Sequence, residues 1–299
     1  MSGPGPPRIT RRALVSWALA ALAALVVLVA VLAADVARYD VASLARTAPR
    51  RTALMRHREA EARPRAYRVD QRWIPYDRIS PLLRRAVLIA EDDAFYAHGG
   101  LDWHEIRESA RRNWQKRRIV RGGSTITQQL ARNLFLGNER TLTRKIREVL
   151  LARRLEAALS KRRIFELYLN TIEWGDGIFG AEAAAQRWFG VGADQLDARQ
   201  AALLASIIIN PRRFSPVEPS RRIERRMRTI LGRMARRGFI TEDELHAARG
   251  DAPRPSAAEW LFGAPPPPDT VDLGADTETE EEPPGTEPDS AATDSSRSE

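Results

Sequence analysis

Apolar side chains fill almost every position from Ala13 to Ala34, where Ser16 is the single clearly polar residue. A helix of these 22 residues would be about 33 Å long, which is enough to cross a bilayer core of about 30 Å. The run is longer than the apolar core of a signal peptide, about 7–15 residues, and no clear small-x-small cleavage site follows it. We therefore predict a retained transmembrane anchor over 13–34, in preference to a cleaved signal or a buried core helix.

From about residue 73 onward, apolar positions repeat at helical spacing and no run alternates like a strand. Ser80 and Pro81 form an N-cap and a first-turn proline ahead of an apolar stripe that ends at Glu91. Further helix starts are predicted at Thr141, at Ser160, and at the capping-box pairs Asp197/Gln200 and Thr241/Glu244. The body of the chain is therefore predicted to be mainly α.

These patterns divide the chain into five parts. We predict an N-terminal segment over 1–12, the anchor over 13–34, an Arg- and Ala-rich juxtamembrane segment over 35–72, a helical domain over 73–250, and a Pro-rich acidic tail over 251–299. The tail is expected to be disordered, because its few apolar residues cannot bury enough surface to offset the entropy of ordering.

Charge separates the tail from the rest of the chain. Residues 264–299 hold 11 acids and one base, whereas the other 263 residues hold 47 bases and 28 acids. So basic a body is expected to meet an anionic partner: nucleic acid, anionic lipid or a phosphorylated substrate. Trp103 and Trp114 lie within a basic stretch, 103–121, that suits lipid headgroups beside an anchor better than nucleic acid, although a solvated face remains an alternative. The absence of Cys excludes disulfides, Cys-ligated metals and thiol catalysis.

Three clusters could carry chemistry. EDDAFYAHGG (91–100) places a carboxylate at the end of an apolar helix, where desolvation would make it a better base. GGSTITQQLARN (122–133) is a dense hydrogen-bonding stretch that leads into a helix, and RKIRE (144–148) sets two cations and an acid on one helix face. Taken singly, each also fits a structural role: a helix end, an N-cap, or an exposed ion-pair ladder. The GxGxxG match at 175–180 follows a helical pattern rather than a strand, so no dinucleotide site is predicted.

Taken together, five ordered blocks resemble the family 51 peptidoglycan glycosyltransferases, the module also found in bifunctional penicillin-binding proteins. The blocks are EDDAFYAHGG (91–100), GGSTITQQLARNLFL (122–136), RKIREVLLARRLE (144–156), KRRIFELYLNTIEWGDGIFGAEAAAQRWFG (161–190) and AALLASIIINPRRFSP (201–216). The resemblance implies a lysozyme-like, two-lobed, mainly α domain behind the anchor. It is closest to the monofunctional form, because fewer than 90 residues follow Pro211 and no SxxK with KTG pair is present.

The resemblance also assigns roles. Glu91 matches the family's catalytic base, and Glu148 matches a second essential glutamate near the donor's diphosphate. The remaining matches, expected to bind substrate or shape the site, are Asp92, Phe95, His98, Thr125, Gln129, Arg132, Asn133, Arg144 and Lys145. Arg132 stands where the family commonly has Lys, which keeps the charge but replaces a point charge by a planar fork.

The implied activity is polymerisation of lipid II into β-1,4-linked glycan with release of undecaprenyl diphosphate, without transpeptidation. The implied partners are lipid II, the growing strand and inner-membrane lipids, with proteins of wall synthesis or division as candidates and no nucleic acid. No cofactor is obligatory; Mg²⁺ or Mn²⁺ on the diphosphate, with Glu148 nearby, is compatible. The expected location is the cell inner membrane, with a cytoplasmic N-terminus and a periplasmic domain. A lysozyme-like lytic enzyme and a non-catalytic membrane scaffold are the rival hypotheses.

Overall fold

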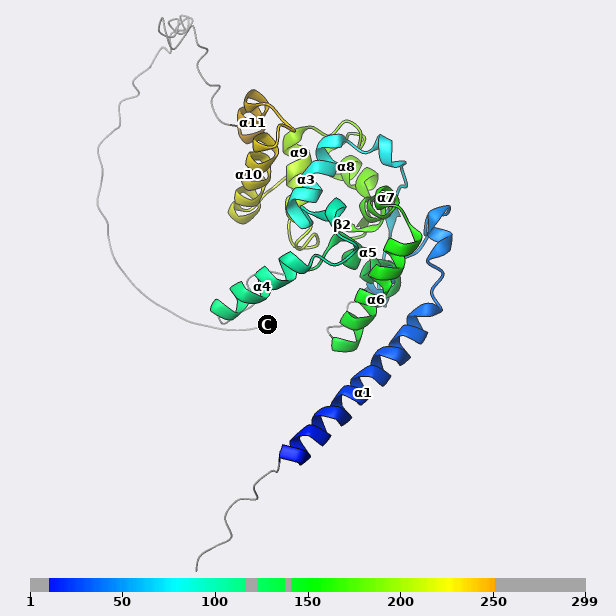
Figure 1. The fold of residues 1–299 in the computed structure, drawn as a ribbon. Helices are drawn as coiled ribbons and strands as arrows, with labels where there is room; N and C mark the ends of the chain where they lie inside the picture. Colours follow the sequence, from blue (N-terminus) through cyan, green and yellow to red (C-terminus); the bar gives the residue numbers. More distant parts are fainter. Residues whose placement is uncertain (1–10, 117–122, 138–140, 251–299) are drawn as a thin grey trace, which may run out of the picture. The chain divides into compact units, whose positions relative to one another are not determined.

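The structure is a computed structural model that describes residues 11–116, 123–137 and 141–250 (Figure 1). The predicted tail over 251–299, most of the N-terminal segment over 1–12, and residues 117–121 of the basic stretch lie outside the described residues. The helices are α1 (Arg11–Ala37), α2 (Ala53–Ala62), α3 (Pro81–Glu91), α4 (Trp103–Gln115), α5 (Ile126–Phe135), α6 (Leu142–Ala158), α7 (Lys161–Thr171), α8 (Ala181–Phe189), α9 (Ala198–Ile207), α10 (Arg221–Arg236) and α11 (Glu242–Arg249). Short 3-10 turns occur at Ala42–Ala45, Tyr76–Arg78 and Phe95–Ala97.

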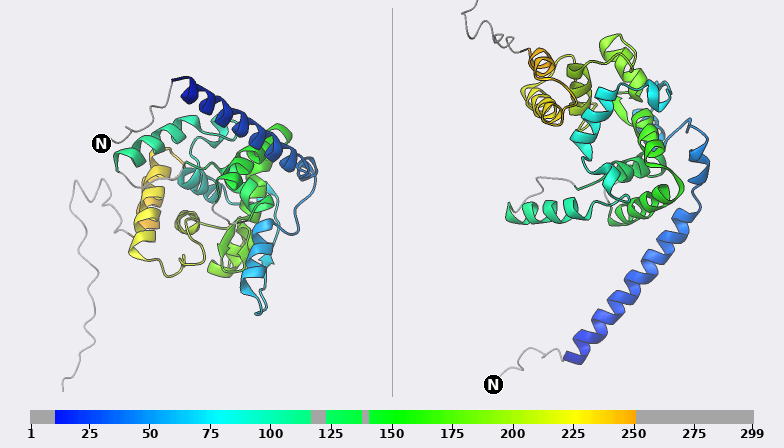
Figure 2. Two further views of the ribbon diagram at one scale, coloured as in Figure 1. Left: turned by 90° about the horizontal axis from the view of Figure 1, so that it is seen from below. Right: turned by 45° about the horizontal axis from the view of Figure 1, so that its top comes forward.

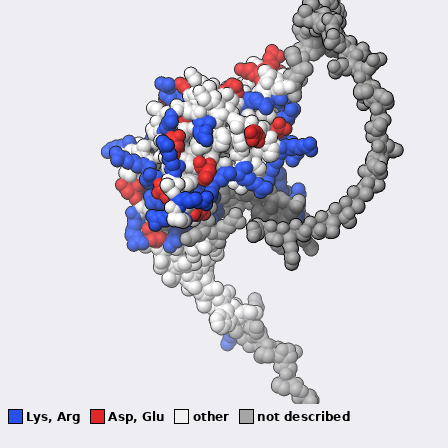
Figure 3. All heavy atoms as spheres, turned by 180° about the vertical axis from the view of Figure 1, so that it is seen from behind, with Lys and Arg blue, Asp and Glu red and all other residues white. Residues whose placement is uncertain are grey.

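Helix α1 is long and apolar enough to cross a membrane, by length and composition. Its apolar part, Leu14–Ala37, has a mean hydropathy of 2.7, and only 6% of the most apolar window is buried. The helix projects from the body in Figure 1 and in the right view of Figure 2, and its surface is almost uncharged where the body carries many Lys and Arg side chains (Figure 3). Its C-terminal end packs on α6, where Leu32 and Val36 are buried.

The core of the body is helical, which confirms the predicted mainly α class. α3 packs against α9 and α10, while α5 packs against α6 and α7. The largest fully buried aromatic side chains are Trp174, Tyr168, Phe95, Phe165 and Phe179. The predicted caps form: Ser80 Oγ accepts from Leu82 N–H, and both capping boxes, at Asp197 and Thr241, close as expected. The lysozyme-like, two-lobed arrangement stays a prediction.

A small sheet interrupts the helical body, where the sequence indicated no strand. β1 (Asp70–Gln71) pairs in parallel with β3 (Ile178–Phe179), which pairs antiparallel with β2 (Glu173–Gly175). Strands of two or three residues are too short to show an alternating pattern, and for this reason they were not predicted. The GxGxxG match belongs to this hairpin: a Cβ on Gly177, at φ +77°, would lie 2.5 Å from the Arg68 carbonyl oxygen.

Folded structure begins well before Trp73, the predicted start of the domain. Val41 and Leu44 belong to the core, and Met55 on α2 is completely buried. Arg58 on α2 donates to the buried Glu173 of β2, with Nη2 2.8 Å from Oε2. The segment that composition assigned to a juxtamembrane linker therefore contributes side chains to the folded body.

Candidate active site

Glu91 is the last residue of α3, and its carboxylate is held from two other helices. The backbone leaves helical geometry at Asp92, with φ −162° and ψ 82°. Gln129 of α5 donates to Glu91 Oε2 at 3.1 Å, and Arg226 of α10 donates to Oε1 at 2.9 Å. The side chain is 13% exposed, so water reaches little of it.

Burial raises the pKa of Glu91 above its ordinary 4.5. The opposing influences are the charge of Arg226, the Gln129 hydrogen bond and the charge of Arg132, which favour the carboxylate without cancelling the effect of burial. A carboxyl group whose pKa is raised towards neutrality is a stronger base once it is ionised. The environment of Glu91 therefore suits proton abstraction.

The Gln129 amide is held in one orientation by a second contact. Tyr168 of α7 donates its hydroxyl proton to Gln129 Oε1 at 2.9 Å, so the amide nitrogen is left to face Glu91. Burial raises the pKa of Tyr168 well above 10, which keeps the hydroxyl a donor at any physiological pH. Tyr168 belongs to the fourth sequence block, 161–190. In the structure, Gln129 links Tyr168 to Glu91, because it accepts from the one and donates to the other.

Asp92 and His98 join the loop after α3 to the start of α5. Asp92 Oδ2 accepts the N–H of Ile126 at 2.9 Å, and His98 Nε2 lies 2.9 Å from Asp92 Oδ1. Phe95 is fully buried, with its ring centre 5.6 Å from that of Phe165. These three predicted residues therefore shape the segment that carries Glu91.

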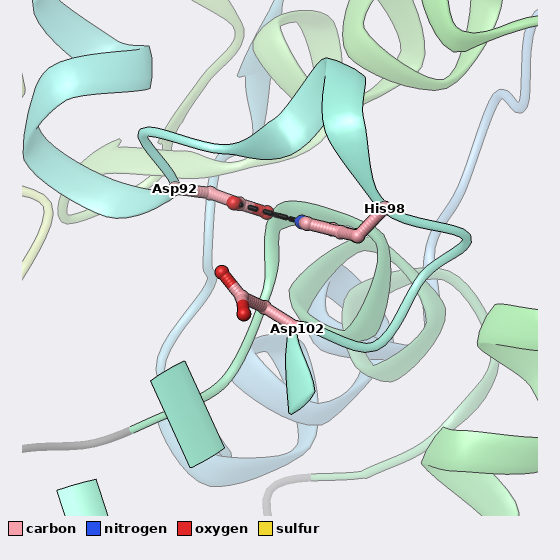
Figure 4. A group of neighbouring side chains, drawn as sticks. All are labelled: Asp92, His98 and Asp102. Carbon is pink, nitrogen blue, oxygen red and sulfur yellow. Dashed lines mark hydrogen bonds and ion pairs between the residues drawn. The ribbon is translucent and has the colours of Figure 1, made fainter. Parts of the chain in front are cut away.

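Asp102 points towards the Asp92–His98 pair (Figure 4). One donor atom from each of the three lies within 4.8 Å of the others, a spacing that could hold a metal ion. Both carboxylates already have partners, however: Asp102 Oδ1 caps α4 by accepting from Glu105 N–H at 2.8 Å, and Asp92 Oδ2 accepts from Ile126 N–H. We therefore assign this cluster a structural role and route no chemistry through it.

Glu148 forms the second predicted centre, on α6. Its side chain is 2% exposed, and Arg144 Nη1 donates to Oε2 at 2.6 Å while Lys145 Nζ donates to Oε1. Lys145 also donates to Ser124 Oγ, just before α5, at 2.9 Å and to Gln128 Oε1 of α5 at 3.4 Å. A buried carboxylate with two partly exposed cations, Arg144 at 17% and Lys145 at 40%, replaces the fully exposed ion-pair ladder that remained an alternative from sequence.

Helix α5 connects the two glutamates. Gln128 contacts Lys145 in the Glu148 cluster, and the next residue, Gln129, contacts Glu91. The two centres are thus bridged by consecutive residues of one helix. On the Gln128 side, a pocket of about 380 Å³ opens among residues of α4, α5 and α6, including Trp103, Ile106 and Lys145.

The remaining predicted residues differ in how close they lie to Glu91. Thr125 is buried in caps and turns: it closes the capping box of α5 and donates to the Gly100 carbonyl oxygen at 2.7 Å. Arg132 is half-buried and close enough to Glu91 to influence its pKa, whereas Asn133 is buried on α5. Thr125 therefore holds the backbone at the start of α5 and at Gly100. Arg132 acts on Glu91 through its charge.

Arg226 also belongs to the site, although it was not predicted from the sequence. Its Nη2 lies 2.9 Å from Glu91 Oε1 and 3.2 Å from the Ala90 carbonyl oxygen, and Arg233 binds the Ile89 carbonyl oxygen at 3.0 Å. Cations are favourable at a helix C-terminus, where carbonyl groups lack partners. Arg226 lies on an arginine-rich helix 135 residues from Glu91, so no local signal distinguishes it from its neighbours.

Comparison with known proteins gives a consistent result. A family model described as Transglycosylase matches residues 58–235, more than half of the chain. The biosynthetic peptidoglycan transglycosylase of Laribacter hongkongensis (strain HLHK9) is 49% identical over 189 residues, which are 62% of this chain and 82% of that relative. The protein of the same name from Janthinobacterium sp. (strain Marseille) is 48% identical over 189 residues, 62% and 81% of the two chains.

Among solved structures, the 2.6 Å crystal structure of penicillin-binding protein 1A from Haemophilus influenzae matches with a TM-score of 0.35 and 18% identity, over 62% of this chain and 18% of that one. The family match begins at residue 58, within α2, in keeping with the buried Met55 and the Arg58–Glu173 pair upstream of Trp73. On the family model and these relatives, the chain belongs to the transglycosylase family.

Proposed function

We propose that this protein polymerises lipid II into β-1,4-linked glycan strands, with inversion at the sugar and release of undecaprenyl diphosphate. The observation that supports this most is the pairing of two unlike carboxylates across α5. Glu91 is buried with a raised pKa, as a base should be, whereas Glu148 is neutralised by Arg144 and Lys145. The relatives' shared name, biosynthetic peptidoglycan transglycosylase, supports the same reaction class.

In this proposal Glu91 is the general base. It removes the proton from the 4-hydroxyl of the acceptor sugar as that oxygen attacks C1 of the donor sugar. The bond between C1 and the diphosphate oxygen breaks at the same time, and the electron pair leaves with the diphosphate. General-base assistance of this kind contributes about 10²–10⁴-fold to rate. Gln129, Arg226 and Arg132 position and tune the carboxylate.

The diphosphate is a good leaving group, so it needs cations more than a proton donor. Arg144 and Lys145 would supply them, because charge-assisted bonds to phosphate oxygens are the strong ones. Glu148 fixes both side chains on one face of α6 before substrate arrives. Two cations beside one carboxylate do not make a cage for a resident divalent metal, so we place Mg²⁺ or Mn²⁺, if used, on the substrate's phosphates rather than in a protein site.

The proposed location is the cell inner membrane, with α1 as a single span, residues 1–12 cytoplasmic and the body periplasmic. The apolar surface of α1 and the exposed Trp103 and Trp114 of α4 support a body seated beside lipid. Proteins of wall synthesis or division are proposed as partners, and nucleic acid is not.

Labelled lipid II dispersed in detergent, with and without Mg²⁺, tests the proposal. The wild-type protein should convert it into long strands, whereas Glu91→Gln should lose at least about a hundredfold in rate because the base is gone. Glu218→Gln, on the loop before α10, is a matched control that should leave the rate unchanged. Degradation of purified glycan with lipid II untouched would instead establish a lytic enzyme, and a cellular role that survives Glu91→Gln would establish a scaffold.

A further inference from the structure

A second cationic pocket lies on α3, separate from the Glu148 cluster. It has a volume of about 230 Å³ and is lined by Tyr76, Pro81, Arg84, Arg85, Leu88 and Tyr96. We call it the Arg84 pocket. None of these residues has a role in the proposed reaction.

The two arginines of the Arg84 pocket carry charge that the protein does not neutralise. Within residues 11–116, 123–137 and 141–250, neither has a carboxylate partner, whereas Arg78 and Arg162 are paired with Asp194 and Asp77. Arg84 Nε is buried and has no hydrogen-bond acceptor. Two adjacent uncompensated cations in a hollow create a strong positive potential, and a buried donor without an acceptor is costly.

Aromatic rings hold these guanidinium groups in place. The Arg84 guanidinium lies 4.4 Å from the centre of the Tyr76 ring, and that of Arg85 lies 4.5 Å from the centre of the Phe239 ring. The hydroxyl groups of Tyr76 and Tyr96 are 3.2 Å apart across the same hollow. Stacked planar cations beside two phenol groups are preorganised to bind an oxyanion through several donors at once.

The position of the pocket limits which anion can reach it. Arg84 and Glu91 lie on one face of α3, seven residues and so about 10 Å apart. Tyr96 belongs to the short loop that follows Glu91. In Figure 1, α1 leaves the body beside α6 and away from α3, so the pocket is remote from the point where the anchor leaves the body, and a bilayer headgroup does not suit it.

We propose that the Arg84 pocket binds a carboxylate of the peptide carried by the peptidoglycan substrate, about two helical turns from the reacting sugar. The inference rests on the proposed function, because it takes its ligand from that substrate. Peptidoglycan sugars carry short peptides with several free carboxylates, and a carboxylate fits a guanidinium fork in a bidentate manner. The pocket would then fix the position of the substrate along α3 while Glu91 acts on its hydroxyl group.

The test compares lipid II with its peptide intact and lipid II whose peptide carboxylates are converted to amides, which preserves size. For the wild-type protein, amidation should raise KM about tenfold with kcat within about twofold, as for loss of one charge-assisted bond. Arg84→Gln/Arg85→Gln should raise KM for the intact substrate by a similar factor and leave the amidated substrate unaffected. The single exposed variant Arg85→Gln should show a smaller effect of the same kind.

Arg72→Gln/Arg78→Gln is the matched control, since it also removes two arginine charges, but from residues that do not line the pocket. It should keep the preference for the intact substrate. A wild-type enzyme indifferent to amidation would overturn the proposal, as would a double variant equally impaired on both substrates. Binding of the protein to anionic vesicles that weakens in Arg84→Gln/Arg85→Gln would also overturn it, in favour of a lipid site.

A binding measurement separates this proposal from the proposed function. Calorimetry with a soluble disaccharide-peptide fragment should detect binding to the wild-type protein that is weakened about tenfold in Arg84→Gln/Arg85→Gln and by amidation. If the wild-type protein does not polymerise lipid II, the proposed function fails, while this measurement still decides the pocket. Equal competition by millimolar inorganic phosphate and by the fragment would show a general anion site and overturn the peptide assignment.

Discussion

At the scale of single residues, the balance around Glu91 sets the chemistry. Burial favours the protonated acid, whereas Arg226, Gln129 and Arg132 favour the carboxylate. A base must be ionised to act, so activity should rise with pH as Glu91 loses its proton. The position of that rise depends on the charges that surround it.

Removal of Arg226 changes this balance in a known direction. Arg226→Ala takes away the largest influence that favours the carboxylate, so the pKa of Glu91 should rise further. The acidic limb of the pH–rate profile should therefore move to higher pH, and the rate at neutral pH should fall about tenfold or more, recovering partly at alkaline pH. The measurement is polymerisation of labelled lipid II from pH 5 to 9.

Arg225→Ala provides the control for Arg226→Ala. Arg225 is the neighbouring arginine on α10 and is exposed. Its removal lowers the net charge equally and should leave the profile in place. A profile that moves equally for both variants, or for neither, would contradict the direct role of Arg226 at Glu91.

At the scale of elements, features that depend on neighbouring residues could be predicted from the sequence, whereas contacts between distant residues could not. Caps at Ser80, Asp197 and Thr241 could be predicted because a side chain and a nearby N–H suffice to make them. The candidate site could be located because its residues cluster within α3, α5 and α6. The sheet was missed because β2 and β3 are too short to alternate, and Arg226 was missed because its partner is 135 residues away.

Asp92 tests how the loop after α3 is fastened to α5. Asp92→Ala would leave the Ile126 N–H and His98 Nε2 without their buried acceptor, which should destabilise the protein by about 2–4 kcal/mol. Asp93→Ala removes an acid from the next position, but that acid is paired with Arg233 and Arg237 at the surface, so the loss should be below about 1 kcal/mol. Urea unfolding of the detergent-solubilised proteins measures both, and equal losses would refute the difference.

At the scale of the whole molecule, the chain joins one helix that is long and apolar enough to cross a membrane to a basic helical body. Composition was enough to predict the long apolar helix, because 22 nearly uninterrupted apolar residues suffice to span a bilayer core. It was not enough to find where the body begins. Residues 41–58 are Arg- and Ala-rich, yet Val41, Leu44 and Met55 are buried by partners distant in sequence.

The exposed face of α1 allows its membrane role to be tested without disturbing the body. Leu22→Arg/Val26→Arg places two charges near the middle of the helix, at side chains that are 57% and 60% exposed. Each charge costs about 2.5–3.5 kcal/mol for insertion, so the protein should move from the membrane fraction to the soluble fraction. Leu22→Ala/Val26→Ala is the control and should stay with the membrane. An arginine variant that remains membrane-bound would show that the body alone holds the protein there.

The locked state of Glu148 has a practical consequence for inhibition. Its two cations share one internal counterion, so an inhibitor's anion must compete with Glu148 for contacts that both cations already make. A dianion that spans Arg144 and Lys145 together would have to displace Glu148 from both of them. Compounds aimed at this site should therefore be ranked by how well they outcompete an intramolecular rival, not by their charge alone.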